Sequence, residues 1–176
     1  SMVLRHPRPP DFSFSPLLIM ARRKRVYHKP VLLDARYESP LVAKLINKLM
    51  RSGKKSLSER IVYKAIDLSN EGTDNVDPLE VLHRAIENAK PRVEVKSRRV
   101  GGATYQVPME VTVERQESLA MRWILGFARG KKGVPMHQCL ANEIKEAAKN
   151  QGSAVRKRDE THKMAQANRA FAHFRW

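Results

Sequence analysis

The segment RVEVKSRRVGGATYQVPMEVTV at 92–113 constrains the fold of this chain more than any other stretch. Apolar and polar residues alternate on both sides of Gly101-Gly102, which is the pattern of two strands joined by a tight turn. A reversing chain needs residues that accept a positive φ at such a turn, and glycine does so without strain. The segment therefore predicts a β-hairpin, and helical patterns precede and follow it.

The length of the hairpin loop decides which side chains share a face. A two-residue loop at the glycines would place the apolar residues of the two strands on opposite faces. A three-residue loop centred on Gly102 would pair Val95 with Met109 and Arg99 with Tyr105, and it would unite the apolar faces. We therefore expect the three-residue loop.

The tip of this hairpin is polar and carries no acid. Its side chains are Lys96, Arg98, Arg99, Tyr105 and Gln106. Cations beside an aromatic ring suit phosphates and stacked bases. On the hairpin alone, an ordinary solvated ribbon is an equally good interpretation.

The composition favours a polyanionic partner. The chain has 34 Lys and Arg against 18 Asp and Glu, a formal net charge of +16 on 176 residues. Such a charge opposes compaction unless a polyanion neutralises it. The length and the 41% hydrophobic residues suit one domain with its own core. The single cysteine excludes an internal disulfide, and no apolar run approaches the roughly 18 residues that a membrane span needs.

The charge is unevenly distributed along the chain. Residues 56–91 hold seven acids and four bases, a net charge of −3, so the remaining residues carry +19. The basic clusters are Arg22-Arg23-Lys24-Arg25, Lys54-Lys55, Lys131-Lys132 and Arg156-Lys157-Arg158. This asymmetry predicts one face for nucleic acid and another for water or protein.

The first 19 residues differ from the rest. Pro16 interrupts their short apolar stretch, which argues against a secretory signal. We expect the natural chain to begin at Met20 and residues 1–19 to be a disordered or artefactual extension, with an organelle-targeting sequence as the alternative. A basic arm at 20–38 and a helical domain at 39–176 would follow.

Helical periodicity predicts six helices, with the hairpin protruding between the third and the fourth. Their start signals are Ser39, Ser56, Asp77, Ser118, Pro135 and Ser153. The last helix should run to about Ala170, and its few large apolar residues make it peripheral. Lys44, Lys48, Arg51 and Lys55 share one face at helical spacing, which we interpret as a solvated face. The expected fold class is mainly α.

Motifs for catalysis or metal binding are absent from the sequence. His137 and Cys139 are two residues apart, so a helix points them away from each other. Cys139 falls on an apolar helix face and suits a core position. No phosphate-cradling loop, nucleophile elbow or paired-histidine zinc motif occurs. We therefore expect no enzymatic activity, no cofactor and no metal.

Several long motifs resemble the bacterial-type small-subunit ribosomal protein seven. They are VEVKSRRVGGATYQVPMEV at 93–111, LAMRW at 119–123 and MAQANRAFAHFRW at 164–176, with GKKS at 53–56 and KRDETHKMA at 157–165 in register. The resemblance covers about residues 20–176. It implies a helical protein with a protruding hairpin that binds the 3′ major domain of 16S rRNA and nucleates assembly of the 30S head. It also implies a place near the decoding centre, beside exit-site tRNA, mRNA and small-subunit proteins nine and eleven.

The resemblance also implies a set of contact residues. The candidate rRNA contacts from the family are Arg22, Arg23, Lys24, Arg25, Lys29, Lys54, Lys55, Lys96, Arg98, Arg99 and Arg122. The remaining basic clusters add Lys131, Lys132, Arg156, Lys157 and Arg158. Arg115 is the last position carried over at the strand-to-helix junction, where the family is often more basic. The expected tRNA-proximal residues are Arg98, Arg99, Gly101, Gly102 and Tyr105.

These expectations describe a scaffold in a cytoplasmic ribosome, although a plastid or mitochondrial ribosome of bacterial type fits equally. Cationic side chains would neutralise phosphates where rRNA helices meet. Two alternatives stay open. One is a general nucleic-acid-binding or architectural protein that acts off the ribosome. The other is a protein-interaction module that uses the acidic stretch at 56–91.

Overall fold

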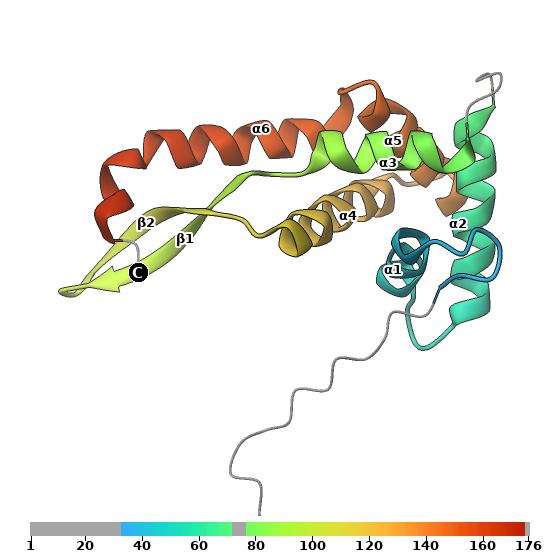
Figure 1. The fold of residues 1–176 in the computed structure, drawn as a ribbon, viewed down its shortest axis with the longest axis horizontal. Coiled ribbons are helices and arrows are strands. Elements are labelled where there is room, and N and C mark those ends of the chain that lie inside the picture. Colours follow the sequence, from blue (N-terminus) through green and yellow to red (C-terminus); the bar gives the residue numbers. More distant parts are fainter. Residues whose placement is uncertain (1–32, 72–76, 175–176) are drawn as a thin grey trace, which may run out of the picture. The chain divides into compact units, whose positions relative to one another are not determined.

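The computed structural model describes residues 33–71 and 77–174. This part of the chain forms six α-helices, one short 3₁₀ helix and one two-stranded antiparallel hairpin (Figure 1). The elements are α1 (Pro40–Leu49), α2 (Lys55–Asn70), α3 (Pro78–Ala89), β1 (Val93–Val100), β2 (Ala103–Glu110), α4 (Val113–Gly130), α5 (Met136–Ala148), α6 (Gly152–Ala167) and η1 (Arg169–Phe174). The predicted fold class, a helical bundle with a hairpin between the third and fourth helices, is confirmed.

The core lies around α5, which packs against α2, α3, α4 and α6. The side chains that fill it are mainly Leu and Ile, each at most 2% exposed: Leu45, Ile46, Ile66, Leu82, Ile86, Ile124, Leu140 and Ile144. Cys139, 1% exposed, is part of this core as predicted. The helical period explains the pattern, because residues three or four apart lie on one face of a helix.

The start of α3 follows directly from its sequence. Asp77 precedes the helix, and its Oδ1 accepts a hydrogen bond from the backbone N–H of Leu79 at 3.0 Å. Pro78 occupies the first helical position, where its missing N–H costs nothing. This local arrangement was predicted correctly because a cap needs only residues close in sequence.

Two other predicted start signals are wrong. α2 begins at Lys55, one residue before the proposed Ser56 cap, and no side chain caps it. α4 begins at Val113, so Ser118 lies inside the helix, where its Oγ accepts a hydrogen bond from Lys48 Nζ at 2.7 Å. A hydroxyl can therefore serve a tertiary contact as readily as a cap, and sequence does not distinguish the two.

The predicted register of the hairpin is also wrong. Arg99 pairs with Thr104, and Val95 pairs with Pro108, so the loop has two residues. Gly101 and Gly102 have φ of +58° and +88°, and positive φ at both central residues is what a two-residue hairpin turn requires. The turn chemistry therefore decides the register.

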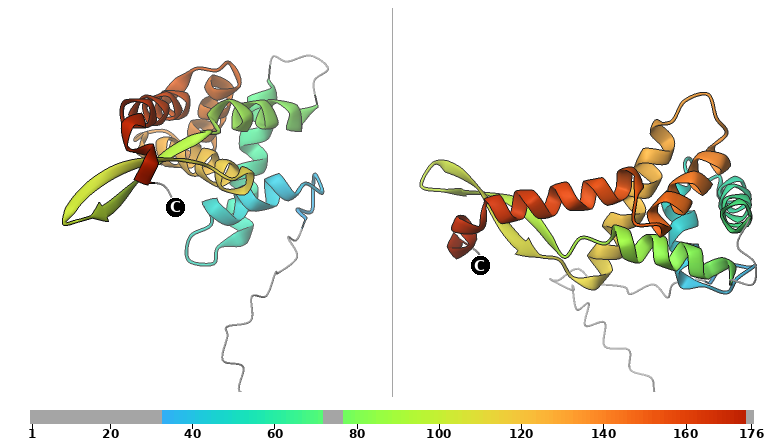
Figure 2. Two further views of the ribbon diagram at one scale, coloured as in Figure 1. Left: turned by 60° about the vertical axis from the view of Figure 1, so that its left-hand side comes forward. Right: turned by 90° about the horizontal axis from the view of Figure 1, so that it is seen from above.

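The three-residue loop was predicted because it would unite the apolar residues of the two strands on one face, and in the structure these residues do not share one face. α6 runs alongside the hairpin and contacts both strands, while η1 packs against β2 (Figure 2). Val107 is only 2% exposed, and Val93 and Val95 are partly buried. Because helical segments cover parts of the ribbon, its apolar residues need not gather on one face. The last helix also ends earlier than predicted, at Ala167, and continues as η1.

Candidate nucleic-acid interface

A cluster of cations lies where α1 meets α4. Burial lowers the pKa of Lys48, and the positive charges of Arg122 and Lys44 lower it further. Lys44 has a carboxylate partner, Glu117, at 3.1 Å, but the partner of Lys48 is the neutral hydroxyl of Ser118. Positive charge at this site is therefore incompletely neutralised within the described residues, which suits an incoming anion.

The predicted cations of the hairpin differ in the contacts that their side chains make with the rest of the protein. Lys96 Nζ lies 3.4 Å from a Glu94 carboxylate oxygen. Arg98 donates a hydrogen bond to the backbone carbonyl of Phe174 in η1. Arg99 is exposed near the turn. Among the predicted tip cations, Arg99 is thus the one whose side chain is most open to a partner.

Tyr105 packs into an aromatic cluster instead of standing alone at the tip. Its ring centroid lies 5.4 Å from that of Phe171 and 4.8 Å from that of Phe174. Such pairs contribute about 0.5–1.5 kcal/mol each beyond their buried area. Together with the Arg98 bond, they fasten the C-terminal segment to the part of the hairpin that the sequence predicted to lie near tRNA.

Arg115 joins the base of the hairpin to α4. Its Nε and Nη2 donate to the two carboxylate oxygens of Glu94, both at 2.8 Å. These bonds lower the pKa of Glu94 and raise that of Arg115. A guanidinium engaged bidentately with a carboxylate has less capacity for phosphate, so we interpret Arg115 chiefly as a structural residue.

Two of the remaining basic clusters each contain one cation that bonds to another group of the protein and one exposed neighbour. Lys131 Nζ lies 2.8 Å from Oε1 of the buried Glu143 although the Lys131 side chain is itself partly exposed, and Lys132 is exposed as well. Arg158 donates to the backbone carbonyl of Asn88 and to Asp159, whereas Arg156 is exposed. Three further predicted contacts belong to these clusters. Lys54 is exposed and precedes α2. Lys55 lies 3.8 Å from Glu59, and Lys157 lies 3.2 Å from Glu160.

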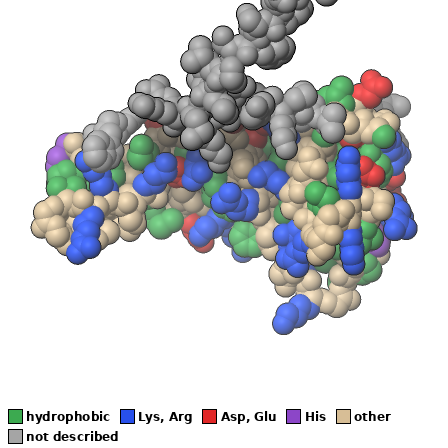
Figure 3. Space-filling view, turned by 90° about the horizontal axis from the view of Figure 1, so that it is seen from below, with side chains coloured by type: hydrophobic (Ala, Val, Ile, Leu, Met, Phe, Trp, Pro, Cys, Tyr) green, Lys and Arg blue, Asp and Glu red, His purple; other side chains and the backbone are tan. Residues whose placement is uncertain are grey.

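Figure 3 shows Lys and Arg side chains along one face, from the hairpin at the left to the helical bundle at the right. Fewer Asp and Glu side chains appear among them. The predicted contacts Arg22, Arg23, Lys24, Arg25 and Lys29 lie outside the described residues. Over 33–71 and 77–174, no group of three His, Cys, Asp or Glu side chains is placed to hold a metal ion, and no helix is long and apolar enough to cross a membrane.

The sequence pattern of one protein family, ribosomal protein S7p/S5e, matches residues 21–169. The chain belongs to this family. It is 76% identical over 157 residues to small ribosomal subunit protein uS7 of Akkermansia muciniphila, 55% to that of Syntrophobacter fumaroxidans and 50% to that of Protochlamydia amoebophila. Each alignment covers 89% of this chain and 100% of the relative. The resemblance inferred from the motifs is therefore confirmed, and S7 proteins are structural components of the small ribosomal subunit.

Sequence reasoning missed two cations of this S7 chain that the structure places in basic surroundings. Lys48 was interpreted as part of a solvated face, and Arg129 was not singled out. The sequence signal for a role of Lys48 was its helical spacing from Lys44 and Arg51, but the cations of a solvated helix face show the same spacing. Only the approach of α4 to α1 distinguishes the two interpretations.

Proposed function

We propose that this chain is a primary rRNA-binding protein that binds the 3′ major domain of 16S rRNA and nucleates assembly of the 30S head. Membership in the S7 family supports the small-subunit role. The observation that supports the proposal beyond family membership is the position of Lys48 between α1 and α4, where its side chain contacts the neutral hydroxyl of Ser118 and lies in the positive field of Lys44 and Arg122.

The mechanism is scaffolding. Exposed cations neutralise phosphates where several rRNA helices meet, and the counterions released drive binding. A-form RNA hides the base edges in its deep major groove, so the protein recognises shape and single-stranded junctions more than duplex sequence. The rigid bundle then fixes the angles between the bound RNA helices.

The hairpin and its neighbourhood define the expected position on the ribosome. We infer that the tip, from Arg98 to Tyr105, lies near exit-site tRNA and the mRNA path at the subunit interface, close to the decoding centre. Small-subunit proteins nine and eleven are the expected neighbours. The attachment of η1 to β2 supports this role, because a two-stranded ribbon alone is marginally stable in water.

Binding of the full chain to the isolated 3′ major domain, compared with an unrelated folded RNA of equal length over a salt series, tests the proposal. We expect a preference for the 3′ major domain that survives physiological salt. Lys48→Gln should weaken binding and reduce the salt slope by about 0.7–0.9 if Lys48 meets one phosphate. Lys163→Gln, an exposed cation on α6, is the matched control and should cost less.

Two results would contradict the proposal. Equal binding to both RNAs, lost steeply with salt, would mean that charge alone carries the interaction. A preference for duplex DNA over both RNAs would favour the alternative, an architectural protein that acts off the ribosome.

A further inference from the structure

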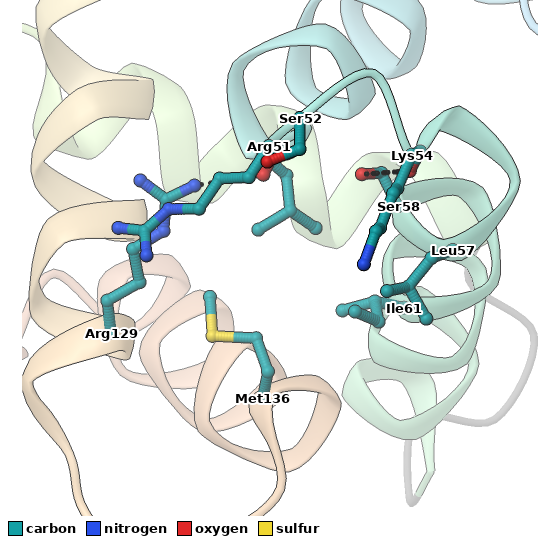
Figure 4. A pocket seen from close by; sticks show the side chains of 9 residues that line it. Arg51, Ser52, Lys54, Leu57, Ser58, Ile61, Arg129 and Met136 are labelled. Atoms are coloured by element: carbon teal, nitrogen blue, oxygen red, sulfur yellow. Dashed lines mark hydrogen bonds between the residues drawn. The ribbon is translucent and has the colours of Figure 1, made fainter.

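A cavity of about 290 Å³ opens between the end of α1, the start of α2 and the facing parts of α4 and α5 (Figure 4). Its apolar side chains are Leu49, Leu57, Ile61 and Met136, and its cations are Arg51, Lys54 and Arg129. None of the described residues that line it is acidic. The cavity therefore combines an apolar floor with a positively charged rim.

Arg129 is held in place within this cavity. Its Nη2 donates to the backbone carbonyl of Leu49 at 2.9 Å, at the end of α1. Burial lowers the pKa of Arg129, and the positive charge of Arg51 lowers it further. Two guanidinium groups, both on exposed residues, line the same cavity, and no acidic residue is among the described residues that line it, so this rim suits an anion.

The size and chemistry of the cavity limit what can occupy it. Pockets for drug-sized ligands measure about 300–1,000 Å³, so this cavity suits a small group. RNA-binding proteins stack unpaired bases on aromatic rings or on the planes of arginine guanidinium groups. A nucleotide supplies both required parts, a flat base for the apolar floor and a phosphate for the rim. An acidic side chain of a protein would supply the charge but no flat apolar body.

We propose that this cavity binds one unstacked nucleotide of rRNA, with its base against Leu57, Ile61 and Met136 and its phosphate on Arg51 and Arg129. The inference rests on the proposed rRNA binding and adds a base-recognition site to it. Phosphate contacts position the protein on the nucleic acid, whereas contacts to an inserted base add sequence specificity.

The floor and the rim can be tested separately. Leu57 is 44% exposed, so Leu57→Ser should leave the fold intact, which thermal unfolding verifies. We expect this variant to bind the 3′ major domain about tenfold more weakly, equivalent to about 1.4 kcal/mol, with an unchanged salt slope. Leu33→Ser, the same change at a leucine that is 58% exposed elsewhere, is the matched control and should bind as the unmodified chain does. Arg51→Gln should instead reduce the salt slope by about 0.7–0.9.

Chemical probing of the bases supplies the second measurement. One base that the unmodified protein protects should regain its reactivity with Leu57→Ser, while the other protections remain. If Leu57→Ser binds normally and only Arg51→Gln changes the slope, the cavity is a phosphate site and the inference is wrong. If Leu57→Ser binds RNA normally but fails to enter assembled subunits, the cavity receives a protein side chain, which also overturns it. Failure of the unmodified chain to prefer the 3′ major domain would refute the proposed function itself, before any variant is compared.

Discussion

The ion pair between Lys131 and Glu143 leads to a prediction about stability. Glu143 lies on α5 with 1% exposure, and Lys131 Nζ, 2.8 Å away, follows the end of α4. Removing one partner of a fully buried pair costs about 3–5 kcal/mol, because a charge is left without compensation. The Lys131 side chain is 38% exposed, so water screens the pair and we expect about 2 kcal/mol for Lys131→Met.

Thermal unfolding measures this cost. For a chain of 150–250 residues, about 2 kcal/mol lowers Tm by about 4–8 °C. Lys132→Met is the matched control, because Lys132 is the exposed neighbour in the same loop, and its Tm should stay within about 1–2 °C of the unmodified chain. The double variant Lys131→Met with Glu143→Leu should recover much of the loss, since an apolar pair removes the buried charge.

The same pair predicts a dependence on pH. Glu143 raises the pKa of Lys131 above its ordinary value. The stabilisation is therefore fully present below the unfolded-state pKa of lysine, about 10.4, and is lost as pH rises through the higher folded-state value. The Tm difference between the unmodified chain and Lys131→Met should be constant from pH 7 to 9 and should shrink only as pH rises beyond about 10.4. This account of Lys131 would be refuted if the unmodified chain and Lys131→Met had equal Tm values at pH 7. It would also be refuted if the Tm loss of the double variant equalled the sum of the losses of Lys131→Met and Glu143→Leu.

Three further predictions concern the hairpin and the basic face. Valine at both Gly101 and Gly102, where φ is +58° and +88°, should strain the turn by about 1–2 kcal/mol per residue and weaken tRNA binding more than rRNA binding, as filter binding with each RNA would show. Phe171→Ala should remove about 0.5–1.5 kcal/mol of ring contact with the hairpin and speed amide hydrogen exchange in β2 by about two- to tenfold, with little change in helical circular dichroism. Arg122→Gln should raise the pKa of Lys48, because the Arg122 charge depresses it, and an NMR titration that finds no rise would count against the cation cluster.

The helices of this S7 protein could be predicted from sequence because their signals are local. The apolar spacing of Leu45, Ile46 and Leu49 is enough to define the buried face of α1. Asp77 and Pro78 are enough to start α3. Each of these features depends on residues within one or two turns, so no knowledge of distant partners is needed.

The hairpin register was mispredicted because the apolar pattern was interpreted without the distant segments that cover the ribbon. The three-residue loop assumed that the ribbon had one apolar face to hide. The coverage comes from α6 and η1, about 60 residues later in the chain, and Val107 is buried without a united face. The local signal, two adjacent glycines, was the better guide. The alternation of residues in a strand shows which residues are apolar, but it does not show whether other segments of the chain cover one face of the hairpin or both.

The sequence predicts basic clusters, but it does not show which cation of a cluster bonds within the protein. In two of the described clusters one cation compensates charge or satisfies carbonyls inside the protein, as Lys131 does for Glu143 and Arg158 does for Asn88. Its neighbour, Lys132 or Arg156, is exposed. A count of lysines and arginines cannot make this division, because it depends on which acids fold against which cations.

This division determines how much of the positive charge is available to RNA. A cation that holds a buried carboxylate would have to leave it uncompensated in order to bind phosphate, at a cost comparable to the gain. Mutating such a residue therefore weakens RNA binding, if at all, through loss of stability, whereas mutating its exposed neighbour lowers the salt slope with Tm unchanged. Measuring both quantities for Lys131→Met and Lys132→Met separates the structural cations from the binding ones. If both variants lower the salt slope equally and neither lowers Tm, the cations of the cluster act together on RNA, and the assignment of Lys131 to the fold is wrong.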